Sequence, residues 1–232
     1  MVNPRISKYT IEASEEAYCD NGNMAEIIDW LVKTVTPEDT FVDVGAHVGC
    51  MFIPTVMETK PKRAIAIEPT PETFGFLKKN CKQIKGIPYE LCNMAVSDKT
   101  GEAMMYDCSW GSPSNTLIDR FEGKQSPTIA VKTIAVGDMK LDGPIVMKID
   151  AELSEPQVWE GLRPHFPKIR AIVMEMFVHG YDGAGIKIEP FIQQIRKDGF
   201  EILNLDEKPM SDTDIIISGK TDIILKNALY KL

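Results

Sequence analysis

The chain has 232 residues, of which 44% are hydrophobic, and its 26 basic and 34 acidic side chains give a net charge of −8. This length and composition suit one globular domain with a sizeable core. A chain with this acidic excess lacks the broad basic surface of a nucleic-acid binder. No run of apolar residues approaches the ~20 that span a bilayer. We therefore expect neither nucleic acid nor membrane among its partners.

The cysteine pattern and the first residues bear on the compartment. The five cysteines form no C-x-x-C pair, and an odd, widely spaced set is a poor disulfide framework or zinc site. They are Cys19, Cys50, Cys81, Cys92 and Cys108. Residues 1–20 are polar and lack the apolar core of a signal peptide. The sequence predicts reduced thiols and a cytoplasmic protein, and it carries no signal of an oligomeric state.

In chain order, residues 1–36 predict a helical N-terminal segment that packs on the core, because apolar side chains recur at helical spacing from residue 24 to residue 35. A buried strand is predicted over residues 41–44. The helix expected over residues 48–58 contains Pro54, which predicts a kink or a late start. A strand over residues 63–67, a helix over residues 71–81 and further strands over residues 89–94, 103–106 and 129–136 follow.

The second half continues the alternation. Strands are predicted over residues 145–150, 169–174, 200–205 and 223–225, with helices over residues 155–161 and 190–197. Continuous apolar strands that alternate with helices are typical of an α/β fold, with a mostly parallel sheet and helices on both faces. We predict a single domain overall, with this fold over residues 37–232.

Polar residues follow several of the predicted strands. They are Asp43, Glu68, Asn93, Asp150 and Glu175. In parallel sheets, ligands bind beyond the carboxyl ends of the strands, near the point where the strand order switches. The sequence therefore predicts that these five side chains meet at one rim of the sheet.

The segment Asp43-Val44-Gly45-Ala46-His47-Val48-Gly49 directly follows the apolar pair Phe41-Val42, at the end of the first strand, and has the form D-x-G-x-x-x-G. Glycines allow a tight turn to approach a ligand closely. Glu68, at the end of the next strand, is placed to bind a ribose diol. This pairing suits S-adenosylmethionine better than a nicotinamide dinucleotide, whose usual signature is G-x-G-x-x-G and whose pyrophosphate Asp43 would repel. A nicotinamide-dependent oxidoreductase stays open as an alternative.

Each acid also has a simpler interpretation. Asp43 could merely cap the following helix, where a carboxylate satisfies free backbone N–H groups. Glu68 could be an ordinary solvated strand end. Capping alone, however, does not require Gly45 and Gly49 at their spacing.

These motifs together resemble the FkbM family of S-adenosylmethionine-dependent methyltransferases, over about residues 40–175. The supporting segments are Phe41 to Gly49, Ala66-Ile67-Glu68-Pro69, Asn93-Met94-Ala95-Val96-Ser97-Asp98, Met147-Lys148-Ile149-Asp150-Ala151-Glu152 and Ile172-Val173-Met174-Glu175. The resemblance implies a Rossmann-like class I methyltransferase fold. It also implies methyl transfer to a hydroxyl of a small-molecule acceptor, often a sugar or a polyketide-like metabolite.

The resemblance further implies roles for individual residues. Gly45, Ala46 and Gly49 would surround the methionine part of the cofactor, and Glu68 would bind both ribose hydroxyls. Ser97 and Asp98 would lie near adenine, and Asp150 would face the methionine amine or the acceptor. The predicted cofactor-binding residues are Asp43, Gly45, Ala46, His47, Gly49, Glu68, Pro69, Ser97, Asp98 and Asp150.

Two residues depart from the family pattern. Leu153 replaces the glycine of K-I-D-x-E-G-x-E, and His47 replaces a common asparagine. These departures keep open a second alternative, a methyltransferase-like binding module that has lost catalysis.

Methylation of an alcohol is helped by a general base. The candidates are Asp150, Glu152, Glu175 and His179, and we predict a catalytic role for Asp150, Glu175 and His179. Asp150 and Glu175 end adjacent predicted strands, so their carboxylates are expected to shift each other's pKa. His179 lies in a predicted loop over residues 177–181, where a histidine is more often simply solvated.

Two further features stay open. The same carboxylates offer oxygen ligands that suit Mg²⁺, but the spacing does not demand a metal, and none is assigned. Residues 110–115 are a candidate lid over the cofactor or acceptor, or a plain surface turn.

Overall fold

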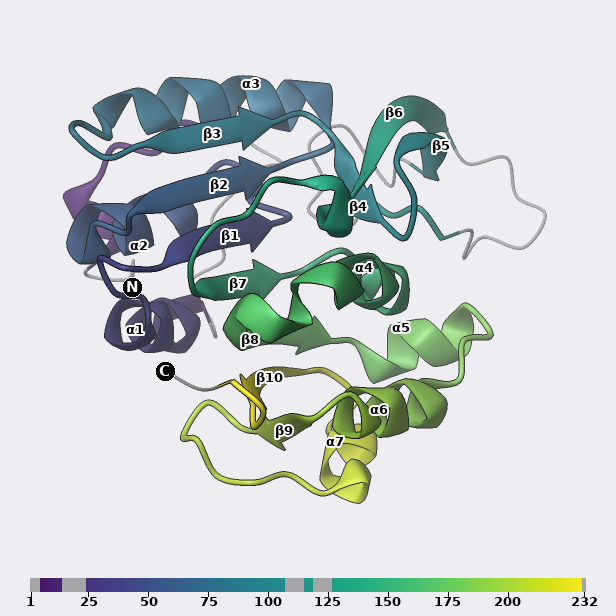
Figure 1. Ribbon diagram of the computed structural model, residues 1–232. Coiled ribbons are helices and arrows are strands. Elements are labelled where there is room, and N and C mark those ends of the chain that lie inside the picture. Colours follow the sequence, from purple (N-terminus) through teal and green to yellow (C-terminus); the bar gives the residue numbers. More distant parts are fainter. Residues whose placement is uncertain (1–4, 14–23, 107–114, 119–126, 231–232) are drawn as a thin grey trace.

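Figure 1 shows the computed structural model of the protein, which describes residues 5–13, 24–106, 115–118 and 127–230. A seven-stranded sheet has the order β3-β2-β1-β7-β8-β10-β9. Strand β10 runs in the opposite direction to the other six. Its strands are β1 (Thr40–Val44), β2 (Arg63–Ile67), β3 (Tyr89–Cys92), β7 (Ile145–Ile149), β8 (Ile169–Met176), β9 (Phe200–Leu203) and β10 (Thr221–Asn227). The predicted, mostly parallel α/β sheet is confirmed.

Helices cover both faces of this sheet. They are α1 (Met24–Thr34), α2 (Phe52–Thr59), α3 (Pro71–Asn80), α4 (Glu155–Leu162), α5 (Val178–Gly183), α6 (Ile188–Lys197) and α7 (Asp212–Ser218). Successive side chains of a strand point to opposite faces. Phe41 therefore packs with helices α1 to α3, whereas Val42 packs with helices α4 to α7.

Short 3₁₀ helices complete the described elements: Ile6–Lys8, Cys81–Gln83, Val136–Asp138 and Arg163–Lys168. The late start expected of the second helix is also observed. Helix α2 begins at Phe52, so Pro54 falls in its first turn. Backbone N–H groups have no intrahelical partner there, and proline is tolerated.

Three strands form a second, smaller sheet outside the central one. Strands over residues 103–106 and 129–136 were predicted, whereas a separate sheet and its third strand were not. The three strands are β4 (Ala95–Ser97), β5 (Gly101–Tyr106) and β6 (Thr128–Ala135), in the order β4-β6-β5. Only three residues separate β4 from β5. A parallel crossover needs a dozen or more residues, so β5 runs opposite to β4. It pairs antiparallel with β6, which is parallel to β4.

Other boundaries also differ from the prediction. Strand β8 continues past Glu175 to Met176, and residues 178–181 of the loop expected over residues 177–181 belong to helix α5. Helix α7 was not predicted; its capping box is formed by Ser211 and Asp214. The candidate lid over residues 110–115 lies outside the described residues except for Asn115.

The N-terminal helix shares the main core. Ile27, Trp30 and Leu31 of α1 are buried with Phe41 of β1 and Phe52 of α2. Among the described residues, the predicted N-terminal segment 1–36 therefore shares a core with the rest of the chain. Within those residues, no helix has the length and apolar character needed to cross a membrane.

One cysteine corrects the expectation of reduced thiols. Cys50, directly after the glycine turn, is disulfide-bonded, and its partner lies outside the described residues. Cys81 and Cys92 are free thiols.

Candidate active site

The strand order switches between β1 and β7. From β1 the sheet extends through β2 and β3 on one side, and through β7 and β8 on the other. A cavity lies at the carboxyl ends of these strands, and Gly45, Glu68 and Asp150 from three of them line it. This is the position where open α/β sheets bind ligands.

The glycine turn is fixed by contacts with neighbouring strands. The N–H groups of Gly45 and Ala46 both donate to the carbonyl oxygen of Ile67, each over 3.0 Å. Gly45 has φ +74°, and a Cβ there would lie 1.9 Å from the carbonyl oxygen of Asp150. Gly45 is therefore required by the close approach of the end of β7. The sequence pattern had suggested the close approach of a ligand instead.

The remaining residues of the turn divide between the cavity and the core. His47 lines the cavity and adopts φ +51°. Gly49 and Ala46 do not line it. A Cβ at Gly49 would instead contact the side chains of Ile53 and Leu77, at 3.0 and 3.1 Å. Gly49 thus serves the packing of α2 and α3 beneath the turn.

Glu68 is buried at the cavity wall, with 5% of its surface exposed. One carboxylate oxygen accepts from the N–H of His47 over 3.0 Å, and the other accepts from the N–H of Thr70 over 2.8 Å. Burial is the main reason that its pKa rises to about 7. The solvated strand end considered above is thereby ruled out. Each oxygen retains a lone pair for a further donor.

Backbone around Glu68 is held in place by Asn93. The Asn93 Nδ2 donates to the carbonyl oxygens of Glu68 and Pro69, each over 2.9 Å. Pro69 also lines the cavity. Asn93, expected at the rim, therefore supports the wall of the site.

The next wall of the cavity is apolar. It is formed by Met94, Ala95, Val96, Met105 and Leu117. Ser97 and Asp98, predicted to lie near adenine, do not line this cavity. Strand β4 carries them past the rim, and Asp98 borders a separate shallow hollow with Lys99 and Asp138. The residues just before Ser97 line the cavity in their place.

Beneath the turn lies a buried cluster of charges. Asp43 is fully buried and its carboxylate lies 3.5 Å from Nζ of Lys148, which also lies 3.3 Å from the carboxylate of Asp150. Burial raises the pKa of Asp43 to about 6, against the opposing effect of Lys148. Asp43 neither lines the cavity nor caps α2, which begins at Phe52. Its observed partner is a lysine that the sequence analysis did not single out.

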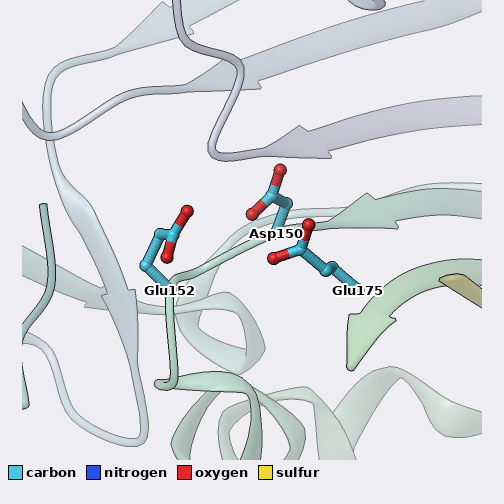
Figure 2. A group of neighbouring side chains, drawn as sticks. All are labelled: Asp150, Glu152 and Glu175. Carbon is cyan, nitrogen blue, oxygen red and sulfur yellow. The ribbon is translucent and has the colours of Figure 1, made fainter. Parts of the chain in front are cut away.

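Three carboxylates converge, as Figure 2 shows: Asp150, Glu152 and Glu175, with oxygen atoms within 4.8 Å of one another. Asp150 and Glu152 line the cavity, and Glu175 lies beside them. Asp150 pairs with Lys148, and Glu175 pairs with Lys220 over 2.8 Å. Among the described residues, Glu152 has no such ion pair, and it lines the cavity.

The proton affinities in this group are high. Burial, followed by the charge of Asp150, raises the pKa of Glu152 to about 8 and that of Glu175 to about 7. The expectation that Asp150 and Glu175 lie close together is confirmed. The three carboxylates are near enough to share a cation, but two of them already have ammonium partners.

Backbone conformation at Glu152 is unusual. Glu152 and Leu153 have φ +47° and +74°, a region that costs non-glycine residues on the order of 1–3 kcal/mol. The hydroxyl of Thr116 donates to the Glu152 carbonyl. Leu153 is buried at 1% exposure against helix α5, which offsets the strain of a position where glycine fits better. The Leu153 departure thus changes core packing and not the cavity lining.

Ser154 and Glu155 were not predicted to be part of the site. Ser154 lines the cavity at 2% exposure, and its hydroxyl has no hydrogen-bond partner in the part of the chain that the structure describes. Glu155 accepts from the N–H of Ala151 over 2.8 Å and from the hydroxyl of Tyr181. Tyr181 is thereby engaged in the core and not exposed at the cavity.

His179 does not join the other predicted catalytic residues. It is exposed on α5, its N–H donates to the carbonyl of Gly219 over 3.2 Å, and it neither lines the cavity nor belongs to the carboxylate group. The predicted loop would have let His179 turn toward the strand ends, whereas helix α5 directs it to Gly219.

No protein-family model matches the sequence, and no curated protein matches it. Solved structures match in fold. A methyltransferase FkbM from Methylobacillus flagellatus KT is 16% identical with a TM-score of 0.52, and the match covers 82% of this chain and 44% of that chain. A precorrin-6y C5,15-methyltransferase from Geobacter metallireducens GS-15 is 10% identical with a TM-score of 0.50 over 93% of both chains.

An rRNA methylase from Streptococcus thermophilus is 10% identical with a TM-score of 0.50, covering 90% of this chain and 99% of that chain. The present chain spans less than half the length of the FkbM protein. At these identities the likeness concerns the fold. The chain has the Rossmann-like fold of class I methyltransferases, as the resemblance implied.

Proposed function

We propose that this protein is an S-adenosylmethionine-dependent methyltransferase, related to the FkbM family, that methylates a hydroxyl of a small molecule. The observation that carries the proposal is Glu68. It is a buried carboxylate oriented by two backbone N–H groups, and it faces a cavity at the switch point of the sheet. A preorganised acceptor pair of this kind suits the two hydroxyls of a ribose.

The cavity fits this cofactor in chemistry. Glu68 and Pro69 would hold the ribose, and the apolar wall from Met94 to Val96 would take the adenine ring. Gly45, His47 and Asp150 would surround the cationic methionine part, and the unpartnered hydroxyl of Ser154 offers one more hydrogen bond. Ala46, Gly49 and Asp43 would act from behind this wall, and Ser97 and Asp98 lie beyond it.

A nicotinamide dinucleotide fits less well. Glu68, Asp150 and Glu152 all line the cavity, and wherever these carboxyl groups are ionised they repel a pyrophosphate. We therefore rank the oxidoreductase alternative below the methyltransferase. The alternative of an inactive binding module loses support because Leu153 packs in the core and leaves Asp150 and Glu152 at the cavity.

When bound, the cofactor would supply an electrophilic methyl group on its sulfonium sulfur. The chain must then hold the acceptor in line and remove the hydroxyl proton. Glu152 is the best-placed base, because it lines the cavity without an ion-pair partner among the described residues and its pKa of about 8 is matched to neutral solution. Asp150 and Glu175 would raise the proton affinity of Glu152 through their negative charge, and His179 would take no part. We assign no role to Mg²⁺.

The acceptor itself should carry no dense negative charge. Three carboxylates border the predicted transfer point, and the whole chain has a net charge of −8. Both features disfavour a polyphosphate acceptor such as RNA, although one protein of similar fold is an rRNA methylase. A neutral, hydroxyl-bearing metabolite fits this end of the cavity better.

The proposal is tested by incubating the protein with tritiated S-adenosylmethionine. Acceptors would be a panel of neutral hexosides, catechols and hydroxylated macrolides, with total ribosomal RNA in parallel. We expect label in a neutral acceptor as an alkali-stable ether, and none in RNA. Label in RNA and in none of the neutral acceptors would contradict the proposed acceptor class.

A further inference from the structure

Lys148 is a buried cation that the proposed chemistry has not yet used. It lies in β7 among Ile145, Val146, Met147 and Ile149, and only 5% of it is exposed. Burying an ammonium group costs several kcal/mol unless it is paired and hydrogen-bonded. A lysine in this position therefore needs a set of partners that compensates the cost.

The sheet register supplies those partners. Lys148 stands directly opposite Asp43 of β1, so both side chains project from the same face of the sheet. Nζ of Lys148 lies 3.5 Å from the Asp43 carboxylate and 3.3 Å from the Asp150 carboxylate. It also donates to the carbonyl of Gly45 over 2.7 Å. One ammonium group thus joins the ends of β1 and β7 and the first residue of the glycine turn.

Two of these partners line the cavity and Lys148 does not. Gly45 begins the glycine turn, and Asp150 contributes a carboxylate to the lining. Because Lys148 holds the Gly45 carbonyl and the Asp150 carboxylate together, it sets the shape and charge of that end of the cavity. Glu68, at the ribose end, is fixed by the separate N–H groups of His47 and Thr70.

We propose that Lys148 is a positioning residue for the amino-acid portion of the cofactor, acting through Gly45 and Asp150. This inference rests on the proposed function. It predicts different effects on two kinds of ligand. Loss of Lys148 should weaken the binding of ligands that carry the homocysteine portion, whereas a ligand that ends at the ribose should bind as before.

The test compares S-adenosylhomocysteine with adenosine by isothermal titration calorimetry. For Lys148→Met we expect affinity for S-adenosylhomocysteine to fall at least tenfold, and affinity for adenosine to stay within threefold of wild type. Lys168→Met is the matched control, because Lys168 also donates to a backbone carbonyl, that of Leu141 over 2.8 Å, away from the cavity. It should change neither affinity. Thermal melts establish that each variant is folded.

A single substitution leaves Asp43 buried without its cation. If Lys148→Met does not fold, the double variant Asp43→Asn/Lys148→Met removes both charges, and Asp43→Asn alone separates the two contributions. We expect the double variant to lose homocysteine-dependent affinity beyond the loss seen with Asp43→Asn.

Several outcomes would overturn the inference. Unchanged binding of S-adenosylhomocysteine would do so. An equal loss of both ligands would too, since that is the mark of a merely structural role. A double variant no weaker than Asp43→Asn would also overturn it. Wild type that binds neither ligand would overturn the proposed function, and this inference with it.

Discussion

Glu68 is the residue on which cofactor binding depends most. Replacing it with alanine should weaken binding of S-adenosylhomocysteine by on the order of 2–4 kcal/mol, because a charge-assisted pair of hydrogen bonds is lost. The His47 and Thr70 N–H groups that Glu68 accepts from would also lose their partner. Calorimetric titration measures the effect.

Glu72→Ala is the matched control for this prediction, since Glu72 is exposed in the first turn of α3 only four residues away. It should bind the ligand as wild type does. A folded Glu68→Ala variant with wild-type affinity would remove the ribose assignment.

Glu152 is expected to act on the acceptor and not on the cofactor. Glu152→Gln should lower the rate of methyl transfer to a hydroxyl acceptor by about 10²–10⁴-fold, the usual contribution of general base catalysis. Affinity for S-adenosylhomocysteine should change little. Single-turnover rates with the acceptor found in the panel assay measure the first effect, and calorimetry the second.

The exposed Glu201 of β9 provides the comparison, and Glu201→Gln should leave the rate unchanged. If Glu152→Gln retains the wild-type rate, the base is another group, and Asp150 or Glu175 becomes the leading candidate.

At the scale of the elements, the glycine turn packs so closely on the end of β7 that no side chain fits at Gly45. Gly45→Ala would place a Cβ 1.9 Å from the Asp150 carbonyl oxygen, at φ +74°. The turn or strand β7 must shift, so the variant should be destabilised by more than about 1–2 kcal/mol and should lose binding of S-adenosylhomocysteine. Chemical denaturation and calorimetry measure the two effects.

Gly75→Ala in helix α3 is the opposite case. A Cβ there meets no atom within 4 Å, and alanine favours helix, so stability should rise by about 0.5–1 kcal/mol. Equal stability losses in the two variants would show that the Asp150 contact is not what requires Gly45.

The elements also show how far the sequence could be interpreted. Every strand of the central sheet was predicted. The signal is clearest for β1, β2, β7 and β8, because buried parallel strands are continuous apolar runs bounded by turns. Helix α5 was missed because Gly180 and Gly183 disfavour helix, and its six residues depend on tertiary packing of Val178 and Tyr181. The error moved His179 from a helix to a loop and made it a candidate base.

The site was only partly predictable for a related reason. Acids at strand ends identified Glu68, Asp150 and Glu175, since topology alone brings strand ends together. Ser97 and Asp98 do not line the cavity because they lie at the end of β4, and the sequence did not predict that β4 leaves the central sheet for the β4-β6-β5 sheet. A signal for Lys148 was present: a charged residue within a buried apolar strand requires a partner.

For the whole molecule, several buried carboxyl groups give stability a definite pH dependence. Burial raises the pKa of Asp43 to about 6 and those of Glu68 and Glu155 to about 7. The folded protein therefore holds protons that the unfolded chain releases. This stabilisation is complete below the ordinary carboxyl pKa and is lost as pH rises through 6 to 7.

The ligand-free protein should consequently melt at a higher temperature at pH 5.5 than at pH 8. For a chain of this size, each 1 kcal/mol corresponds to about 2–4 °C. Glu155→Gln should show a smaller difference between the two pH values. Calorimetric melts over this range measure both, and a melting temperature that rises from pH 5.5 to pH 8 would contradict the burial of these groups.

The central claim concerns the ligand that this cavity binds. Isothermal titration calorimetry of the purified protein with S-adenosylmethionine and S-adenosylhomocysteine, alongside NAD and NADP, tests it most directly. We predict micromolar binding of the two adenosyl ligands and none of the nicotinamide cofactors. Selective binding of NAD or NADP, or binding of none of the four, would contradict the account.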